Sequence, residues 1–196
     1  MFSGIVKTTG KIKKIEKKNK KVYFTIKTNN FLNNIKIGAS IACDGVCLTV
    51  VKKTKNSFQA ELMPETLRIT KFSNSKIGDF INLEKSLRVG DFVDGHFVMG
   101  HIDGIGKIQK IILDKEYVNL IIKIPKGLKK FLAYKGSVSI NGVSLTISGV
   151  GNNWFKVSLI THTLEITNLS CLKINDKVNI EIDMVARYLE KLKISL

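Results

Sequence analysis

The side chains best suited to chemistry lie in a ten-residue segment that the sequence contains twice. Residues 40–49 read SIACDGVCLT, and residues 137–146 read SVSINGVSLT. Cys47 of the first copy corresponds to Ser144 of the second, so a thiol and a hydroxyl occupy equivalent places. Two binding faces with unlike functional groups suit two copies of one ligand that play different roles.

Each copy of the segment is expected to fold as a β-hairpin. Asp44-Gly45 and Asn141-Gly142 are strong two-residue turn signals, because these residues tolerate the positive φ of a type I′ turn. Strand alternation then gathers small side chains on one face of each hairpin and apolar side chains on the other. The small side chains are Ser40, Ala42, Cys47 and Thr49 in the first hairpin and Ser137, Ser139, Ser144 and Thr146 in the second. A solvated face would usually carry Lys, Glu or Arg, so we expect these faces to let a flat ligand lie close to the backbone.

The three histidines could move protons or hold a ligand. His101 stands where the first half has Ile5, beside a glycine that both halves share, and this favours a proton-transfer role. A packed or solvated histidine is the alternative, and the sequence assigns no single role to His96. His162 corresponds to Glu65 and could hold a ligand edge or cap a helix.

The two hairpins belong to a longer internal repeat, which predicts two domains. Residues 66–84 return as residues 163–181 with 10 of 19 positions identical and no gap. A unit near 90 residues is long enough to bury its own core, so we expect domains over residues 1–90 and 91–183. Short β-rich runs separated by polar turns predict an all-β fold with a small closed barrel in each domain.

Short helical turns are expected between the strands. Pro64 can begin a turn over residues 64–68, whose counterpart in the second half is residues 161–165. Residues 31–35 and 128–132 are a second matched pair.

The tail of the chain has no counterpart in the first half. Asp183 can cap a helix over residues 184–196, in which Val185, Leu189 and Leu192 recur at i, i+4 and i+7. This narrow apolar seam could pack on the chain's own barrel or form a subunit contact, and the sequence leaves both open.

The composition narrows the class of protein. With 196 residues, 44% of them hydrophobic, and only two prolines, the chain is globular. The net charge of +16 would favour anionic ligands, but the lysines are scattered and the hairpin faces lack stacking aromatics, so we expect no nucleic-acid partner. No apolar run is long enough to span a bilayer, and the start lacks the features of a signal peptide, so no membrane association is expected. The odd number of three cysteines does not suggest a disulfide framework, and we expect a cytoplasmic protein. Neither a metal-ligand spacing nor a Gly-rich phosphate loop occurs, so no metal and no cofactor are expected.

Five segments together resemble the riboflavin synthase family. They are Met1–Val6, Asp44–Thr49, Met63–Arg68, Gly95–His101 and Asn141–Thr146, and the resemblance extends over essentially the whole chain. It implies two tandem six-stranded antiparallel β-barrels, each binding one 6,7-dimethyl-8-ribityllumazine, and a C-terminal amphipathic helix that holds a homotrimer. The implied reaction passes a four-carbon unit between two lumazines, held in barrels of neighbouring subunits, to give riboflavin and 5-amino-6-(ribitylamino)pyrimidinedione. The resemblance implies neither a metal nor an organic cofactor, and it makes lumazine synthase a candidate partner.

The resemblance also implies which residues form the sites. Residues tied to activity are Phe2, Ser40, Cys47, His96, His101, Ser144 and Asp183. Substrate-binding positions in the first half are Gly4, Ile5, Val6, Cys47, Leu48, Thr49, Glu61, Leu62, Met63, Pro64, Glu65 and Thr66. In the second half they are Gly100, His101, Ile102, Lys135, Ser144, Leu145, Thr146, Ser158, Leu159, Ile160, Thr161, His162 and Thr163. The chain departs from the family at Thr161, where proline is common, and at Asp94, where glycine is usual.

The chemistry expected from this resemblance is an assisted proton loss followed by ring attack. The 7-methyl protons of the lumazine are acidic because the conjugated ring absorbs the charge. We expect His101 to shuttle protons, Ser144 and Cys47 to contact the two rings, and Lys135 to orient a ribityl chain or a ring oxygen. A non-catalytic lumazine- or flavin-binding antenna protein is the alternative, although the intact hairpins and the presence of Cys47, His101 and Ser144 favour the enzyme.

Overall fold

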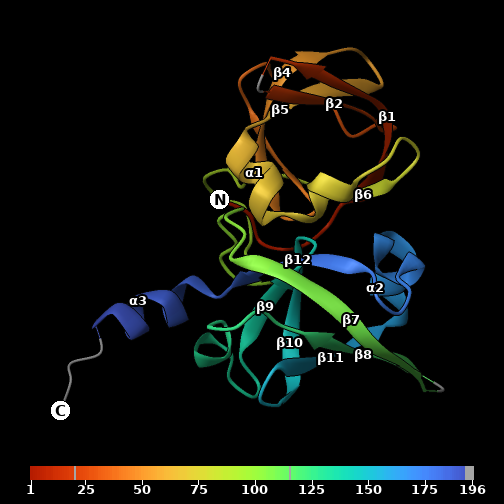
Figure 1. Ribbon diagram of the computed structural model, residues 1–196. Coiled ribbons are helices and arrows are strands. Elements are labelled where there is room, and N and C mark those ends of the chain that lie inside the picture. Colours follow the sequence, from red (N-terminus) through yellow and green to blue (C-terminus); the bar gives the residue numbers. More distant parts are fainter. Residues whose placement is uncertain (20, 115, 193–196) are drawn as a thin grey trace.

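The computed structural model describes residues 1–19, 21–114 and 116–192 of the chain. These residues form two closed six-stranded antiparallel β-barrels and a C-terminal helix (Figure 1). The all-β fold with two barrels is therefore confirmed.

The first barrel is built from the first half of the chain. Its strands are β1 (Thr8–Lys18), β2 (Lys21–Lys27), β3 (Ser40–Cys43), β4 (Val46–Lys53), β5 (Ser57–Leu62) and β6 (Phe80–Lys85). They close in the order β1-β2-β5-β4-β3-β6. Helix α1 (Pro64–Ile69) and the 3₁₀ turn η1 (Lys71–Asn74) connect β5 to β6.

The second barrel repeats this plan. Its strands are β7 (Gly104–Leu113), β8 (Tyr117–Lys123), β9 (Ser137–Ile140), β10 (Val143–Val150), β11 (Trp154–Ile160) and β12 (Lys177–Ile182). They close as β10-β11-β8-β7-β12-β9, which is the same cyclic order. Helix α2 (Thr161–Ile166) and the 3₁₀ turns η2 (Lys129–Phe131) and η3 (Asn168–Cys171) lie between the strands.

Each barrel has its own apolar core. Alternate residues of β2, such as Phe24 and Ile26, are buried, because side chains along a strand point to opposite faces. Gly10 leaves room for this core, since a Cβ there would lie 2.6 Å from Cγ2 of Ile26. The equivalent Gly106 is equally close to Ile180. Close packing therefore explains why both halves keep this glycine.

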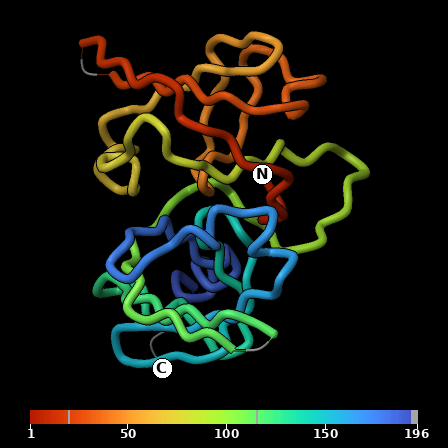
Figure 2. The backbone as a smooth tube through the Cα atoms, turned by 90° about the vertical axis from the view of Figure 1, so that its right-hand side faces the viewer, coloured from red at the N-terminus to blue at the C-terminus, as the bar shows by residue number. Residues whose placement is uncertain are grey.

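The segments that lead into the barrels cross over to the opposite barrel. Val6 belongs to the core of the second barrel, and Ile102 belongs to the core of the first. Where they cross, the two segments pair: Phe2 N–H donates to the Val98 carbonyl at 2.7 Å, and Val98 N–H donates to the Phe2 carbonyl at 3.0 Å. Figure 2 shows the N-terminus at the junction between the barrels, near the yellow-green linker. Each barrel is thus completed by residues of the other half.

The tips of the two hairpins also meet at this junction. Gly45 and Gly142 lie back to back, since a Cβ on either would be 2.7 Å from the backbone nitrogen of the other. Both turns have the expected positive φ values, with Asp44 at 46° and Asn141 at 47°. The predicted type I′ geometry is therefore confirmed.

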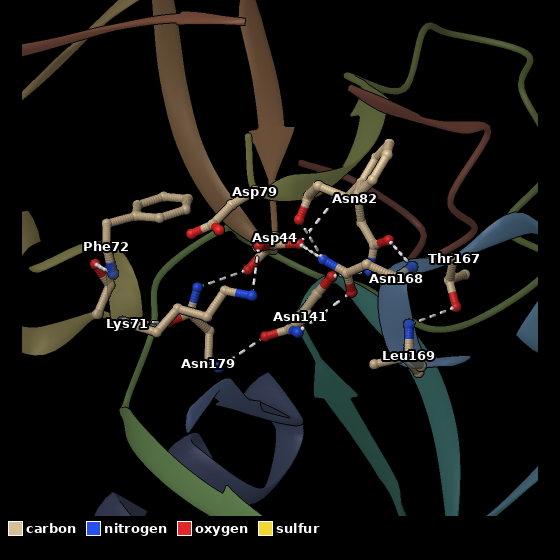
Figure 3. A network of polar contacts seen from close by, with 12 residues as sticks. Asp44, Lys71, Phe72, Asp79, Asn82, Asn141, Thr167, Asn168, Leu169 and Asn179 are labelled. Atoms are coloured by element: carbon tan, nitrogen blue, oxygen red, sulfur yellow. Dashed lines mark hydrogen bonds and ion pairs between the residues drawn. The ribbon is translucent and has the colours of Figure 1, made fainter. Parts of the chain in front are cut away.

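A buried polar network holds the tips together (Figure 3). Asn82 N–H donates to Asp44 Oδ1 at 2.8 Å, and its side-chain amide donates to the Asn141 carbonyl at 2.9 Å. Asn179 makes the equivalent bonds, to Asn141 Oδ1 and to the Asp44 carbonyl, both at 2.9 Å. One charged pair breaks the symmetry, because Lys71 Nζ lies 2.7 Å from Asp44 Oδ2. A satisfied buried network of this kind fixes how the barrels sit on each other.

The C-terminal helix α3 (Met184–Leu192) extends away from the barrels (Figure 1). Asp183 caps it, accepting the Val185 N–H at 2.9 Å. Its apolar seam does not pack on the chain's own barrels, since Val185, Leu189 and Leu192 are each more than half exposed. Residues 193–196 of the expected helix lie outside the described residues.

One expected helical turn is absent. Residues 31–35 form a non-helical turn rather than a helix, because Asn34 adopts a left-handed conformation with φ 64° that interrupts helical geometry. Its counterpart, residues 128–132, does contain the 3₁₀ turn η2. Within the described ranges, no helix has the length and apolarity needed to cross a membrane.

Candidate active site

The two hairpins present the faces that the turn signals predicted. Ser40 pairs with Thr49 and Ala42 with Cys47, while Ser137 pairs with Thr146 and Ser139 with Ser144. The opposite faces point into the barrel cores. Cys43 is fully buried in the first core, whereas Cys47 is half-buried on the other face. The two thiols therefore point in opposite directions, as expected.

Near its tip, each small-residue face is covered by backbone from the other half. Ser144 N–H donates to the Gly4 carbonyl at 2.8 Å, and Cys47 N–H donates to the Gly100 carbonyl at 3.0 Å. A Cβ on Gly4 would lie 2.7 Å from Cβ of Ser144, and one on Gly100 would lie 2.5 Å from Cβ of Cys47. The small side chains thus admit a crossing backbone segment, which the sequence did not predict, and their role in ligand binding stays a prediction. Only the far ends of the faces, at Thr49 and Thr146, are exposed.

This crossing regroups the candidate site residues. Gly4, Ile5 and Val6 join Ser144 on the second barrel, and residues 100–102 join Cys47 on the first. The sequence order suggests the opposite grouping, in which each leading segment serves the hairpin of its own half. The side chain of His101 is exposed beside the first hairpin.

His96, rather than His101, contacts Ser144. Its Nδ1 lies 2.7 Å from Ser144 Oγ, and its backbone N–H donates to the Ser3 carbonyl at 3.1 Å. Burial lowers the pKa of His96 below its usual value, while the charge of Asp183 acts in the opposite direction. A neutral imidazole at this place can accept the serine proton. The structure therefore brings His96 and Ser144 into contact, with the charge of Asp183 near enough to act on His96.

Cys47 lies in a different setting, beside the junction of the two leading segments. It packs against Phe2, Ala42 and Val98, all of which are nearly fully buried. The Phe2 side chain is fully buried in this cluster, and its expected role in activity stays a prediction. Ser40, at the far end of the same face, uses its carbonyl to accept the Ser86 hydroxyl at 2.8 Å.

The rims of the two faces differ in charge. Glu61 on β5 accepts the Tyr23 hydroxyl at 2.9 Å and pairs with Lys21 at 2.8 Å. The hydrogen bond from Lys21 lowers the pKa of Glu61, which is therefore a carboxylate at neutral pH. The equivalent Ser158 on β11 instead donates to Asn119 Oδ1 at 2.7 Å. The first face therefore has a charged rim and the second a neutral one.

Several expected binding positions can offer only their backbone to a ligand. The side chains that are buried in the cores are Val6, Leu48, Leu62, Ile102, Leu145 and Leu159.

Other expected binding positions have exposed side chains near the starts of the two short helices. They are Met63, Pro64 and Glu65 at α1, and Ile160, Thr161 and His162 at α2. Thr66 and Thr163 are half-buried, and their carbonyls each accept a threonine hydroxyl four residues later at 2.6 Å.

Lys135 adopts an unusual backbone conformation. Its φ is 64°, in the left-handed region, whereas the equivalent residue of the first half is Gly38 with φ 88°. A non-glycine residue in this region is disfavoured by about 1–2 kcal/mol. A lysine that tolerates this strain, with its amino group exposed, supports a functional role for its side chain.

Two buried glutamates were missed from the sequence. Glu84 on β6 accepts the backbone N–H of Ser3 at 2.7 Å, its hydroxyl at 2.8 Å and the Gly4 N–H at 3.1 Å. Glu181 on β12 accepts the N–H groups of Met99, Gly100 and His101 at 2.6, 2.9 and 3.2 Å. The available signal was a glutamate kept in both repeats at the same place near the end of the last strand, two residues after an asparagine that both repeats also keep.

Burial dominates the ionisation of both glutamates. It raises the pKa of Glu181 to about 7, against the opposing effect of its backbone donors. It also raises the pKa of Glu84, where Ser3 opposes the shift with both its N–H and its hydroxyl. Among the described residues, no group of three His, Cys, Asp or Glu side chains could hold a metal ion.

Comparisons with known proteins agree with this architecture. A model of the lumazine binding domain matches residues 3–86 and 99–183. The chain is 44% identical to a riboflavin synthase of Brucella abortus, and the match covers 98% of both proteins. It is 43% identical to one of Photobacterium leiognathi and 40% identical to one of Bacillus subtilis, covering 98% and 96% of this chain and 88% of each relative.

Solved structures with the same fold include complexes of LumP. LumP complexed with riboflavin has a TM-score of 0.87 and 27% sequence identity over 93% of this chain and 99% of that one. LumP complexed with 6,7-dimethyl-8-(1'-D-ribityl) lumazine has a TM-score of 0.84 at the same identity over 92% of this chain and 98% of that one.

Proposed function

This chain belongs to the riboflavin synthase family and carries two lumazine-binding domains, and we propose that it converts two molecules of 6,7-dimethyl-8-ribityllumazine into riboflavin and 5-amino-6-(ribitylamino)pyrimidinedione. This is the final step of riboflavin biosynthesis. One observation carries the assignment of roles: two hairpin faces with the same backbone carry unlike reactive groups, Cys47 on one and a His96–Ser144 pair on the other. A reaction in which one lumazine gives a four-carbon unit and the other receives it needs two such sites.

The second barrel holds a histidine that is available in its neutral form at neutral pH. His96 is kept neutral by burial and contacts the Ser144 hydroxyl, so the pair can take up a proton from an acidic ring methyl group. General base catalysis of this kind contributes about 10²- to 10⁴-fold in rate.

The first barrel combines the thiol of Cys47 with the imidazole of His101, which can accept and donate protons. Gly100 rests on Cys47, and His101 follows it in the sequence with an exposed side chain. We propose that His101 carries protons at this site and that Cys47 contacts the ring. Lys135 in the second barrel would hold the ribityl chain or a ring oxygen.

Holding the two rings in attack geometry is the larger contribution. Well-oriented reactants gain about 7–11 kcal/mol from positioning alone. The binding positions that supply this positioning are those given above for the two faces, including the exposed Thr49 and Thr146 and the rims at Glu61 and Ser158.

We propose that the two faces meet across subunits of a homotrimer. The exposed seam of Val185, Leu189 and Leu192 on α3 supports association. Burying this apolar surface against another subunit would remove it from water, which is favourable. A cytoplasmic location and association with lumazine synthase are proposed from the family alone.

A direct test is to mix the purified protein with 6,7-dimethyl-8-ribityllumazine and follow the visible absorbance of riboflavin. We expect riboflavin and the pyrimidinedione in equal amounts. The alternative, an antenna-type binding protein, is suggested by the fold shared with LumP, although the identity to LumP is 27% against 44% to a riboflavin synthase. Lumazine binding without riboflavin formation would favour that alternative.

A further inference from the structure

Each buried glutamate belongs to one barrel and binds the backbone segment that contacts the hairpin of the other barrel. Glu181 belongs to β12 of the second barrel, and its side chain accepts three consecutive backbone N–H groups, those of residues 99–101. Only about 1% of Glu181 is exposed. Hydrogen bonds to an ionised carboxylate are about twice as strong as neutral ones, so this group holds the segment firmly.

The segment that Glu181 holds lies on the first barrel. The carbonyl of Gly100 accepts the Cys47 N–H at 3.0 Å, and Ile102 is buried in the first core. His101 lies between these two anchors. Its backbone is therefore fixed by Glu181 from one barrel and by the Cys47 hairpin from the other.

Glu84 makes the reciprocal arrangement. It accepts the N–H and hydroxyl of Ser3 and the N–H of Gly4, and the Gly4 carbonyl accepts the Ser144 N–H on the second barrel. The Ser3 carbonyl in turn accepts the His96 N–H at 3.1 Å. Glu84 therefore reaches His96 through one intervening residue.

From these contacts we propose that the glutamates are positioning residues of the reaction, with Glu181 placing His101 at the Cys47 face and Glu84 placing His96 at the Ser144 face. Neither carboxylate lies on a hairpin face, and each acts through the segment that it binds. The inference rests on the function proposed above for the catalytic consequences, but the placement itself is a property of the ligand-free protein.

The decisive variants are Glu181→Gln and Glu84→Gln, with Glu16→Gln as a control on the outer surface of β1. Glutamine keeps the size of the side chain but replaces one acceptor oxygen with an NH₂ group that faces N–H donors. We expect each of the first two variants to lower kcat about 10- to 100-fold, since a misplacement near 1 Å costs up to about 10²-fold. Lumazine affinity should change less than about threefold, and Glu16→Gln should behave as wild type.

A pH profile separates positioning from general structural damage. A protonated carboxylic acid presents an O–H to the backbone donors, so wild-type kcat should fall as the pH drops through about 7, where Glu181 titrates. Glu181→Gln should lack this limb, and Glu84→Gln should retain it. A Glu181→Gln variant with wild-type kcat, or with low kcat and an unchanged acid limb, would overturn the proposal, and so would losses of kcat and affinity in parallel.

NMR of the protein without ligand distinguishes failure of this inference from failure of the proposed function. Glu181→Gln should shift the ring resonances of His101 and leave those of His96 in place, and Glu84→Gln should do the reverse. If Glu181→Gln does not fold, the wild-type protein still carries the test, because the amide resonances of residues 99–101 should titrate together. Independent or absent titration of these amides would contradict the proposal even in an active enzyme.

Discussion

Gly100 packs directly against Cys47, although the two residues belong to different halves of the chain. The Cys47 N–H donates to the Gly100 carbonyl at 3.0 Å, and a Cβ on Gly100 would lie 2.5 Å from Cβ of Cys47. Gly4 and Ser144 repeat the relationship on the other barrel. A thiol and a hydroxyl are therefore each held beneath a backbone segment that comes from the opposite repeat.

Replacing Gly100 with alanine should weaken both stability and activity. Its φ of 82° is unfavourable for alanine by about 1–2 kcal/mol, and the collision with Cys47 adds an overpacking cost of about 1–3 kcal/mol. We expect an unfolding free energy lower by about 2–5 kcal/mol in guanidinium titrations. The matched control is Gly127→Ala, at φ 94° with nothing within 4 Å of the added Cβ, which should show the backbone cost alone. Equal losses in the two variants would contradict the close contact.

His96 and Ser144 should act as one unit. Their side chains are 2.7 Å apart, so His96→Asn and Ser144→Ala should be strongly non-additive in kcat/KM. A double-mutant cycle should give a coupling energy of about 1–3 kcal/mol. His101→Asn with Ser144→Ala is the matched control, since these residues lie at different hairpins and should be nearly additive. A His96–Ser144 coupling below about 0.5 kcal/mol would refute a shared role.

Glu181 should make stability depend on pH between its unfolded and folded pKa values. Burial raises its pKa from 4.5 to about 7, so the folded state binds the proton more tightly than the unfolded state. The contribution of Glu181 is therefore fully present below pH 4.5 and is lost as the pH rises to about 7, with a slope of at most about 1.4 kcal/mol per pH unit.

The check is chemical denaturation of the wild type and of Glu181→Gln at several pH values from 4.5 to 8. The difference in unfolding free energy between them should change in favour of the variant up to about pH 7 and stay level above it. A difference that does not vary with pH would show that the carboxyl group titrates normally in the fold.

Lys135 should lower the unfolding free energy of the protein through its backbone strain while its side chain contributes to lumazine binding. Lys135→Gly, which restores the residue type found at Gly38, should raise the unfolding free energy by about 1 kcal/mol because glycine accepts a φ of 64°. The same change should weaken lumazine binding to the second barrel, as measured by fluorescence titration. Lys135→Ala separates the two effects, since it removes the amino group but keeps the backbone strain. Unchanged affinity in both variants would remove Lys135 from the binding site.

The apolar seam of α3 should control assembly. Leu189 is 64% exposed, so Leu189→Glu should leave the barrels folded while it prevents the seam from being buried against another subunit. Sedimentation velocity should show a shift from the proposed trimer to a monomer, and activity should fall with it if the two lumazines bind across subunits. Lys191→Glu, on the same helix but outside the seam, should leave the trimer intact. A fully active Leu189→Glu monomer would show that one chain suffices.

The sequence by itself determined the parts of this protein that depend on local rules. Asp44-Gly45 and Asn141-Gly142 specify their turns through their own backbone preferences, and strand alternation then assigns Cys47 and Ser144 to one face. The N-cap at Asp183 was predictable for the same reason. The one local failure, at residues 31–35, came from the left-handed conformation of Asn34, which an apolar pattern does not reveal.

Only the tertiary structure decided which half serves which face. The segments before the two barrels share a glycine, Gly4 or Gly100, and an apolar residue two positions later, Val6 or Ile102. Each segment could therefore pack on its own hairpin or on the other one, and the sequence does not tell the two arrangements apart. The crossing of Phe2 and Val98 resolves this choice, and it puts His96 on Ser144 and places Gly100 on Cys47. The roles of Glu84 and Glu181 follow from the same crossing, because a buried carboxylate becomes informative only when the donors that surround it are known.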